Sequence, residues 1–291
     1  MRWLIVGADG MLGRHLFATL RQGGIEVAGT SRRKGKQHLH LDLSQDMAAQ
    51  ELPPADIVVI AAAMTHIADC EHNPQTSRQI NVAAPIALAK RIWQEQNAFV
   101  VFISSSGIFD GVDEIPTADT QPRPLNLYGT QKAEAENALT EMAGGKLGLA
   151  IIRPTKMLAS TTPILREWEA ALEHGAAIHP HAWRSMAPLS AAWVAQAIIT
   201  IAASRTAGIW HLSAAQDVSF SDFAKKWAAG RGFPLNLIEP EQRPEISLPR
   251  ARIDMQATMQ RFGLTPPALD TVVSDLCTRP LDEPNFREKS A

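Results

Sequence analysis

The first half of the chain alternates between short apolar runs and stretches in which apolar residues recur at helical spacing. Five runs are predicted to be strands, the most apolar of them covered on both faces of a parallel sheet: residues 4–6, 25–28, 56–63, 98–104 and 147–154. Helices are predicted between them at 11–22, 74–96 and 125–142, the second with a bend where Pro85 falls. This repeated order predicts the α/β class, with a Rossmann-type, doubly wound parallel sheet.

The pattern loosens after residue 153, where prolines punctuate short helical stretches. Residues 190–213 are predicted to supply one more helix and one more strand, which return to the sheet. We therefore predict an NAD(P)-binding Rossmann domain of residues 1–153, completed by 190–213. Residues 154–189 and 214–291 are predicted to form a smaller, α-rich substrate lobe over the ends of the strands.

Composition and charge narrow the class of protein. The chain has 291 residues, 45% of them hydrophobic, and a formal net charge of -2, so charge gives no reason to expect nucleic acid or an anionic membrane as a partner. No apolar run approaches the roughly 18 residues of a spanning helix, and Gly7 interrupts the N-terminus before a secretory apolar region could form. Cys70 and Cys277 lie far apart, outside any CxxC spacing. The cytoplasm is the predicted compartment.

Three glycines follow the first predicted strand in the segment "VGADGMLG". Gly7, Gly10 and Gly13 have the spacing GxxGxxG, which lets the backbone approach a pyrophosphate at the N-terminus of the next helix. Glycine also serves strand-to-helix turns for conformational reasons alone, but its place after the first strand favours dinucleotide binding. We predict that these glycines, with Met11 and Leu12, hold the cofactor.

The end of the second predicted strand indicates which dinucleotide is used. An acid is typical there in NAD-selective sites, whereas this chain has Ser31, Arg32 and Arg33. Guanidinium groups suit a 2′-phosphate, so NADP(H) is favoured over NAD(H), although a basic loop can also be simple surface. Asp42 is predicted to lie near the adenine.

Tyr128 is the one tyrosine in the chain, and Lys132 follows it one helical turn later. A cation on the same helix face favours the phenolate, so we expect Lys132 to lower the pKa of Tyr128 and make it an acid/base at neutral pH. Hydroxyls at the end of the preceding predicted strand, from Ser104 to Ser106, are expected to orient a carbonyl group.

These motifs occur together and in order, and the chain resembles the extended short-chain dehydrogenase/reductases, in particular the dTDP-4-dehydrorhamnose reductase family. The likeness is carried by "GADGMLGRHL", "AAAMTHIADCEHNPQTSRQINVAAPIALAK", "SSSGIFDGVDEIPTADTQPRPLNLYGTQKAEAE" and "IIRPTKML". It implies that NADPH reduces a keto group, on a 4-keto-6-deoxy nucleotide sugar, with Ser105, Tyr128 and Lys132 as catalytic residues. Further cofactor contacts are implied for Ala61, Ala62, Ala63, Thr65, Asn81, Ser104, Tyr128, Lys132 and Arg153.

The chain departs from the family pattern at two places near the substrate. Ser106 and Gly107 replace an Asp-Tyr pair, and Lys156 stands where the family usually has a tryptophan. A cation in place of an indole suits ion pairing with a diphosphate. Ser106, Lys156 and Arg184 are therefore the candidate substrate residues, although structural ion pairing is an equal alternative for Arg184.

The same residues bear on other possible functions. A dehydratase needs acids directly after Ser105, which this chain lacks, whereas a nucleotide-sugar epimerase and a non-catalytic NADP-binding regulatory subunit remain alternatives. The pairs His38/His40 and His179/His181 have no carboxylate or cysteine at the spacing of metal ligands, and the cluster of His66, Asp69, Cys70, Glu71 and His72 is explained equally well by a polar loop, so no metal site is predicted. The predicted partner is a small molecule, and a homodimer is possible.

Overall fold

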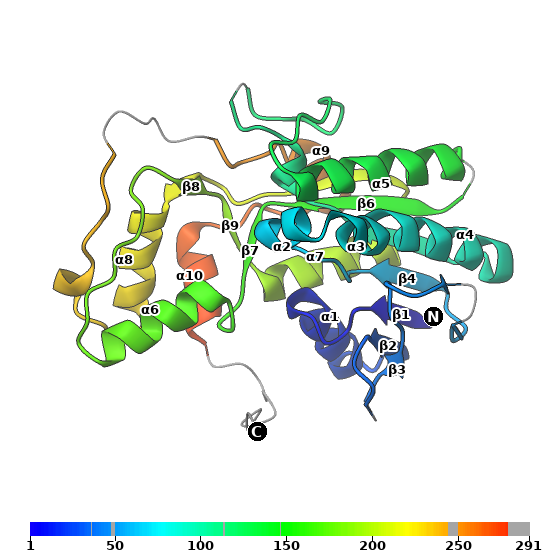
Figure 1. The fold of residues 1–291 in the computed structure, drawn as a ribbon, viewed down its shortest axis with the longest axis horizontal. Coiled ribbons are helices and arrows are strands. Elements are labelled where there is room, and N and C mark those ends of the chain that lie inside the picture. Colours follow the sequence, from blue (N-terminus) through cyan, green and yellow to red (C-terminus); the bar gives the residue numbers. More distant parts are fainter. Residues whose placement is uncertain (36, 48–49, 113, 146, 244–249, 279–291) are drawn as a thin grey trace.

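A seven-stranded parallel sheet forms the centre of the protein (Figure 1). The computed structural model describes all residues except 36, 48–49, 113, 146, 244–249 and 279–291. Side by side, the strands are β10 (Gly208–Leu212), β6 (Leu149–Pro154), β5 (Phe99–Ile103), β4 (Ile57–Ile60), β1 (Trp3–Val6), β2 (Val27–Ser31) and β3 (Leu39–His40). The chain moves outward from β1 in one direction and then from β4 in the other. This is the doubly wound topology predicted from the sequence.

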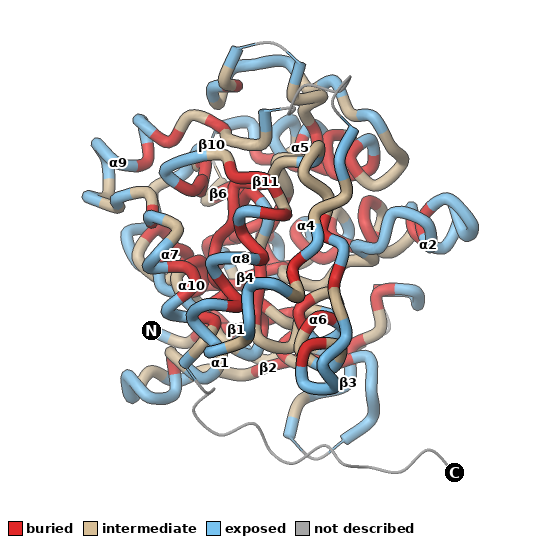
Figure 2. Tube along the Cα trace, turned by 90° about the vertical axis from the view of Figure 1, so that its left-hand side faces the viewer, coloured by how far each residue is buried: buried red, intermediate tan, exposed pale blue. Residues whose placement is uncertain are grey.

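Helices cover both faces of the sheet, with α1 (Met11–Gln22) and α7 (Ala191–Ala203) on one face and α4 (Ala84–Gln96) and α5 (Leu127–Ala143) on the other (Figure 1). Alternate strand residues serve the two faces. Ile5 and Val59 pack toward α1 and α7, and Leu4 and Val58 pack toward α4 and α5. Both faces are buried (Figure 2), which is why the strands are continuous apolar runs rather than alternating ones.

The predicted helix at 74–96 is divided into three parts. It consists of α3 (Pro74–Arg78), a π-helical turn η2 (Gln79–Ala83) and α4. In η2 the Ala84 N–H donates to the Gln79 carbonyl, five residues back. Pro85, which lacks an N–H, follows at the start of α4. The predicted break is thus present as a π turn before the proline. A short helix α2 (Ile67–His72) precedes α3.

Beside the sheet, α6 (Pro163–Glu173), α8 (Phe220–Gly230) and α10 (Leu269–Cys277) pack around a separate apolar cluster that includes Trp168 and Phe223 (Figure 1). Two small strand pairs connect this cluster to the sheet: β7 (Lys156–Leu158) with β9 (Pro188–Ser190), and β8 (Ser185–Met186) with β11 (Val218–Ser219). The remaining helices are η3 (Ser106–Ile108), η4 (Leu235–Leu237) and α9 (Gln256–Phe262). Because β7 directly follows β6, these elements begin at the carboxyl ends of the strands. Within the described ranges, no helix is long and apolar enough to cross a membrane.

Candidate active site and cofactor site

Two glycines of the turn between β1 and α1 leave no room for a side chain. Gly7 has a φ of +88°, and a Cβ there would lie 2.8 Å from the Ala62 Cβ. A Cβ on Gly13 would lie 2.0 Å from the Gly7 carbonyl oxygen, because the first turn of α1 packs directly on the glycine turn. Gly10 is the N-cap of α1 and its side-chain position is open to one side. A cradle of bare backbone at a helix N-terminus fits the pyrophosphate of a dinucleotide.

Six further predicted cofactor residues lie on the two segments beside this turn. Met11 and Leu12 open α1, while Ala61, Ala62, Ala63 and Thr65 follow β4. The Ala61 and Ala62 N–H groups donate to the Val6 carbonyl at 3.0 and 2.9 Å, which holds the second segment against the glycine turn. The Leu12 side chain is buried in the core, so this residue can offer only its backbone to a bound group.

Asn81 holds the loop that follows β4 through hydrogen bonds to the Met64 backbone. It lies in the π turn η2 and is fully buried. Its Oδ1 accepts from the Met64 N–H at 2.8 Å, and its Nδ2 donates to the Met64 carbonyl at 2.9 Å and to the Gln131 Oε1 at 2.8 Å. The amide therefore joins the loop after β4 to helix α5, so Asn81 positions that loop through protein contacts.

The end of β2 carries a small charged cluster. The Ser31 hydroxyl donates to Asp9 Oδ2 at 2.9 Å and accepts from the Arg33 N–H at 2.9 Å, and Arg33 Nε lies 3.8 Å from the same carboxylate. Arg32 is exposed. Sequence reasoning missed Asp9, although an acid between the first two glycines of the motif was a visible signal.

Asp42 lies beyond β3, where its carboxylate caps a turn. Its Oδ1 accepts from the Ser44 N–H at 2.9 Å and from the Ser44 hydroxyl at 2.8 Å. The backbone hydrogen bond from Ser44 holds the pKa of Asp42 below its ordinary value, with a smaller contribution from Arg32. Asp42 and Arg32 are thus close enough to interact electrostatically.

Helix α5 begins at a close contact with the turn η3. The Asn126 side chain caps the helix by accepting from the Gly129 N–H at 2.9 Å. A Cβ on Gly129 would lie 2.2 Å from the Gly107 carbonyl oxygen, so only glycine permits this approach. The first turn of α5 is thereby held against the residues that follow β5.

This contact brings the predicted catalytic residues Ser105 and Tyr128 together. Ser105 Oγ accepts from the Gly107 N–H at 3.0 Å, and the Ser105 side chain is hydrogen-bonded to the Tyr128 phenol. Two hydroxyls at neighbouring strand ends, Ser104 Oγ and Thr155 Oγ1, are buried without a hydrogen-bond partner among the described residues. Unpartnered polar atoms at the carboxyl ends of strands fit a bound group that supplies the missing bond.

The expected effect of Lys132 on Tyr128 is wrong in this structure. Burial raises the pKa of Tyr128 to about 12, opposed by the hydrogen bond with Ser105. The Lys132 Nζ instead donates to the Ile103 carbonyl at 2.7 Å and lies 4.4 Å from the centre of the Phe102 ring. Burial lowers the pKa of Lys132 to about 8. The helical spacing of the two residues therefore does not lower the pKa of Tyr128, because burial is the largest effect on both groups.

The Arg153 side chain is held by protein groups, and its predicted contact with the cofactor stays a prediction. It is 3% exposed, and its Nη2 lies 2.6 Å from Glu136 Oε2. Its Nη1 donates to the Ala118 carbonyl at 3.1 Å and lies 3.3 Å from His211 Nε2. A guanidinium at the end of β6 needed a buried partner, and Glu136, one turn after Lys132 on α5, supplies it.

The predicted substrate residues Lys156 and Arg184 lie close together. Lys156 as a whole is exposed to solvent. Partial desolvation of its ammonium group and repulsion from the Arg184 charge both lower its pKa. Arg184 packs on Trp183 and Phe220, with 5.9 and 5.7 Å from its guanidinium carbon to the ring centres. Neither cation has a carboxylate partner in the part of the chain that the structure describes. The third predicted substrate residue, Ser106, begins η3 directly after Ser105.

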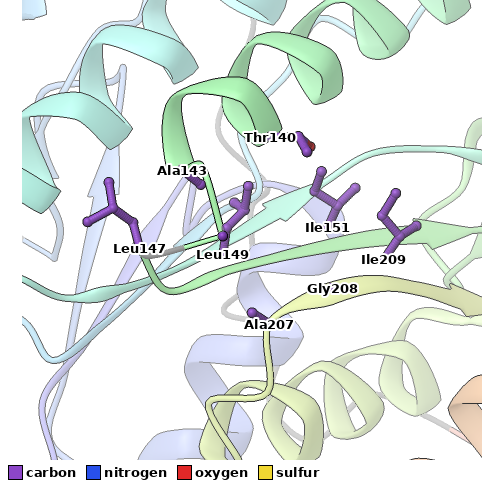
Figure 3. A pocket seen from close by; sticks show the side chains of 9 residues that line it. Thr140, Ala143, Leu147, Leu149, Ile151, Ala207, Gly208 and Ile209 are labelled. Carbon is purple, nitrogen blue, oxygen red and sulfur yellow. The ribbon is translucent and has the colours of Figure 1, made fainter.

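An apolar hollow of about 290 Å³ lies elsewhere, between the C-terminal end of α5 and strands β6 and β10 (Figure 3). It is lined by Thr140, Ala143, Gly145, Leu147, Leu149, Ile151, Ala207, Gly208 and Ile209. Leu149 and Gly208 begin their strands, so the hollow lies toward the amino ends of β6 and β10, and it contains none of the predicted site residues.

A model of the family described as RmlD substrate binding domain matches residues 1–279, which is nearly the whole chain. The chain belongs to this family. The resemblance stated from the sequence is therefore confirmed, and the protein is an NAD(P)-dependent oxidoreductase of the extended short-chain dehydrogenase/reductase type.

Relatives of this RmlD-family protein differ in what their names state. The probable low-salt glycan biosynthesis reductase Agl14 of Haloferax volcanii is 26% identical over 282 residues, which are 91% of this chain and 94% of the relative. The methionine adenosyltransferase 2 subunit beta of Rattus norvegicus is 33% identical over 156 residues, 52% of this chain and 46% of that subunit.

Two solved structures share the fold. A dTDP-4-dehydrorhamnose reductase from Bacillus anthracis in complex with NADP has a TM-score of 0.81 and 20% identity, covering 94% of this chain and 96% of that one. MoeE5 in complex with UDP-glucose and NAD has a TM-score of 0.79 and 22% identity, covering 94% and 98%. The fold thus occurs with either dinucleotide.

Proposed function

We propose that this RmlD-family protein uses NADPH to reduce the keto group of a nucleotide sugar, with a 4-keto-6-deoxy sugar as the first candidate. One observation carries the proposal: the close approach at Gly129 joins Tyr128 to Ser105 by a hydrogen bond, with Lys132 on the next turn of the same helix. A binding module has no need of this arrangement.

The protein's own groups divide the work at the reacting carbon. The nicotinamide ring, when bound, supplies the hydride. Ser105 is proposed to donate a hydrogen bond that orients the substrate carbonyl, and Tyr128 to deliver a proton to its oxygen as negative charge develops there. With a pKa of about 12, the phenol is protonated at neutral pH and so is ready to act as an acid. The Lys132 ammonium is proposed to hold the nicotinamide ribose and to stabilise the phenolate left behind.

The basic end of β2 supports NADPH as the cofactor. Arg32 and Arg33 follow Ser31 at the point where the adenosine ribose of a dinucleotide on this fold is expected. Guanidinium groups form charge-assisted hydrogen bonds with a 2′-phosphate that NADH lacks.

The cations beyond β6 support an anionic substrate. Lys156 and Arg184 repel one another and have no carboxylate partner within the described ranges. Two unneutralised cations at the carboxyl end of a parallel sheet suit a diphosphate, as in a nucleotide sugar.

Oxidation of NADPH, followed at 340 nm against a panel of 4-keto nucleotide sugars with different bases, tests the proposal. Turnover of at least one substrate, abolished by Tyr128→Phe, is the expected result. A second candidate is a non-catalytic subunit, which the 33% identity to the rat subunit over half of this chain favours. Tight NADPH binding with no turnover of any substrate in the panel would support that candidate over the reductase.

A further inference from the structure

The glycine turn carries a carboxylate that the proposed reaction does not use. Asp9 lies between Gly7 and Gly10, and its side chain is 31% exposed. It accepts a hydrogen bond from the Ser31 hydroxyl at 2.9 Å and pairs with Arg33 at 3.8 Å. The backbone beneath it is fixed, because Arg14 Nε donates to the Asp9 carbonyl at 2.8 Å. Asp9 therefore holds Ser31, the last residue of β2, and Arg33, two residues beyond the strand.

The charge at this point is set by few groups. Arg33 is partly neutralised by Asp9, whereas Arg32 has no carboxylate within ion-pairing distance among the described residues. His38 packs against the same strand, where a Cβ on Gly29 would lie 2.6 Å from its Nδ1. Burial lowers the pKa of His38, which disfavours its charged form. Asp9 thus opposes the Arg33 charge directly, and Asp42 interacts with Arg32 without forming an ion pair.

We infer that Asp9 is a specificity-determining residue that lets the protein accept NADH as well as NADPH. The inference rests on the proposed dinucleotide site. A carboxylate accepts hydrogen bonds from ribose hydroxyls, as an acid at the end of β2 does in NAD-selective proteins, but here it comes from the glycine turn. The same carboxylate repels a 2′-phosphate and competes with it for Ser31 and Arg33. Asp9 therefore reduces the preference for NADPH that Arg32 and Arg33 create.

Dissociation constants measured without any sugar substrate test this inference. Asp9→Asn keeps the shape of the side chain and removes its charge. The control is Asp270→Asn on α10, whose carboxylate forms an exposed ion pair with Lys226 of α8. Calorimetric titration of NADPH and NADH, and of adenosine 2′,5′-bisphosphate and AMP, gives two independent ratios. Both ratios should move at least about tenfold toward the 2′-phosphorylated ligand in Asp9→Asn, or about 1.4 kcal/mol, and stay unchanged in Asp270→Asn.

Two results would overturn the inference in distinguishable ways. If the wild-type protein binds both dinucleotides and Asp9→Asn leaves both ratios unchanged, Asp9 does not set specificity, although the dinucleotide site stands. If the folded wild-type protein binds neither dinucleotide, the proposed cofactor site itself is wrong.

Discussion

Replacing Gly129 with alanine tests whether the contact between α5 and η3 builds the active site. The new Cβ would lie 2.2 Å from the Gly107 carbonyl oxygen, whereas ordinary contacts of this kind begin at 3.4 Å, so about 1.2 Å of movement is required. It would also lie 3.0 Å from the Pro124 Cβ, which closes one direction of escape. The first turn of α5, which carries Tyr128, must therefore move away from Ser105.

The cost to activity should exceed the cost to stability. Overpacking of this kind lowers the free energy of unfolding by about 1–3 kcal/mol. The higher helix propensity of alanine offsets about 1 kcal/mol of this loss. A misplacement of roughly 1 Å at a reacting group can reduce turnover by about 100-fold. We therefore expect Gly129→Ala to remain folded, to bind NADPH with an unchanged dissociation constant, and to lose about two orders of magnitude in kcat.

Steady-state kinetics, thermal unfolding and cofactor titration on the same preparation separate these effects. Gly23→Ala is the matched control, because Gly23 ends α1 with a φ of -75° and its Cβ would find atoms only at 3.5 Å or beyond. Wild-type kcat in Gly129→Ala would refute the reasoning, since the helix could then shift without disturbing the chemistry. A loss of NADPH binding would instead show that the variant damages the whole site.

Three further substitutions test the proposed roles. Tyr128→Phe should keep NADPH affinity and lose at least about 100-fold in kcat, the lower end for general acid catalysis; near-normal turnover would exclude the phenol as the acid. Replacing Arg32 and Arg33 together by alanine should weaken NADPH much more than NADH in a binding titration, whereas an equal loss for both would make them surface charge. Lys156→Met should raise KM for the nucleotide sugar by roughly 10-fold, the loss expected from one charge-assisted hydrogen bond. The control Lys225→Met, which removes an exposed lysine on α8, should leave KM unchanged.

The central sheet was predictable because strands that are buried on both faces are continuous apolar runs in the sequence. The helix at 11–22 and the buried strands β1, β4, β5 and β6 follow directly from the length and spacing of apolar residues. The strand predicted at 25–28 lies at Val27–Ser31, and the short edge strand β3 was not predicted. The π turn before Pro85 was predictable only as a break in the helix. A proline shows that one backbone N–H is missing, but it does not show how the neighbouring hydrogen bonds rearrange. The domain boundaries stay a prediction.

The electrostatic details of the site depended on partners that sequence spacing does not reveal. Arg153 and Glu136 are 17 residues apart and meet only because β6 runs beneath α5. Asp9 meets Arg33 only because β1 and β2 are neighbours in the sheet. A charged residue read alone could be a ligand contact or half of an ion pair. The tertiary fold decides between the two.

The same fold is compatible with the proposed role of Lys132, although Lys132 does not lower the pKa of Tyr128. Tyr128, Lys132 and Glu136 follow one another every four residues and so share one side of α5. Burial lowers the pKa of Lys132 by more than the Glu136 carboxylate raises it, so this pKa falls to about 8. At pH 7 that value leaves about ten protonated lysines for each neutral one, so the cation is present when Tyr128 gives up its proton. A phenol that holds its proton and a lysine that is still charged are the protonation states that the proposed reduction needs. The residues of α5 are therefore ready for the proposed proton transfer at neutral pH.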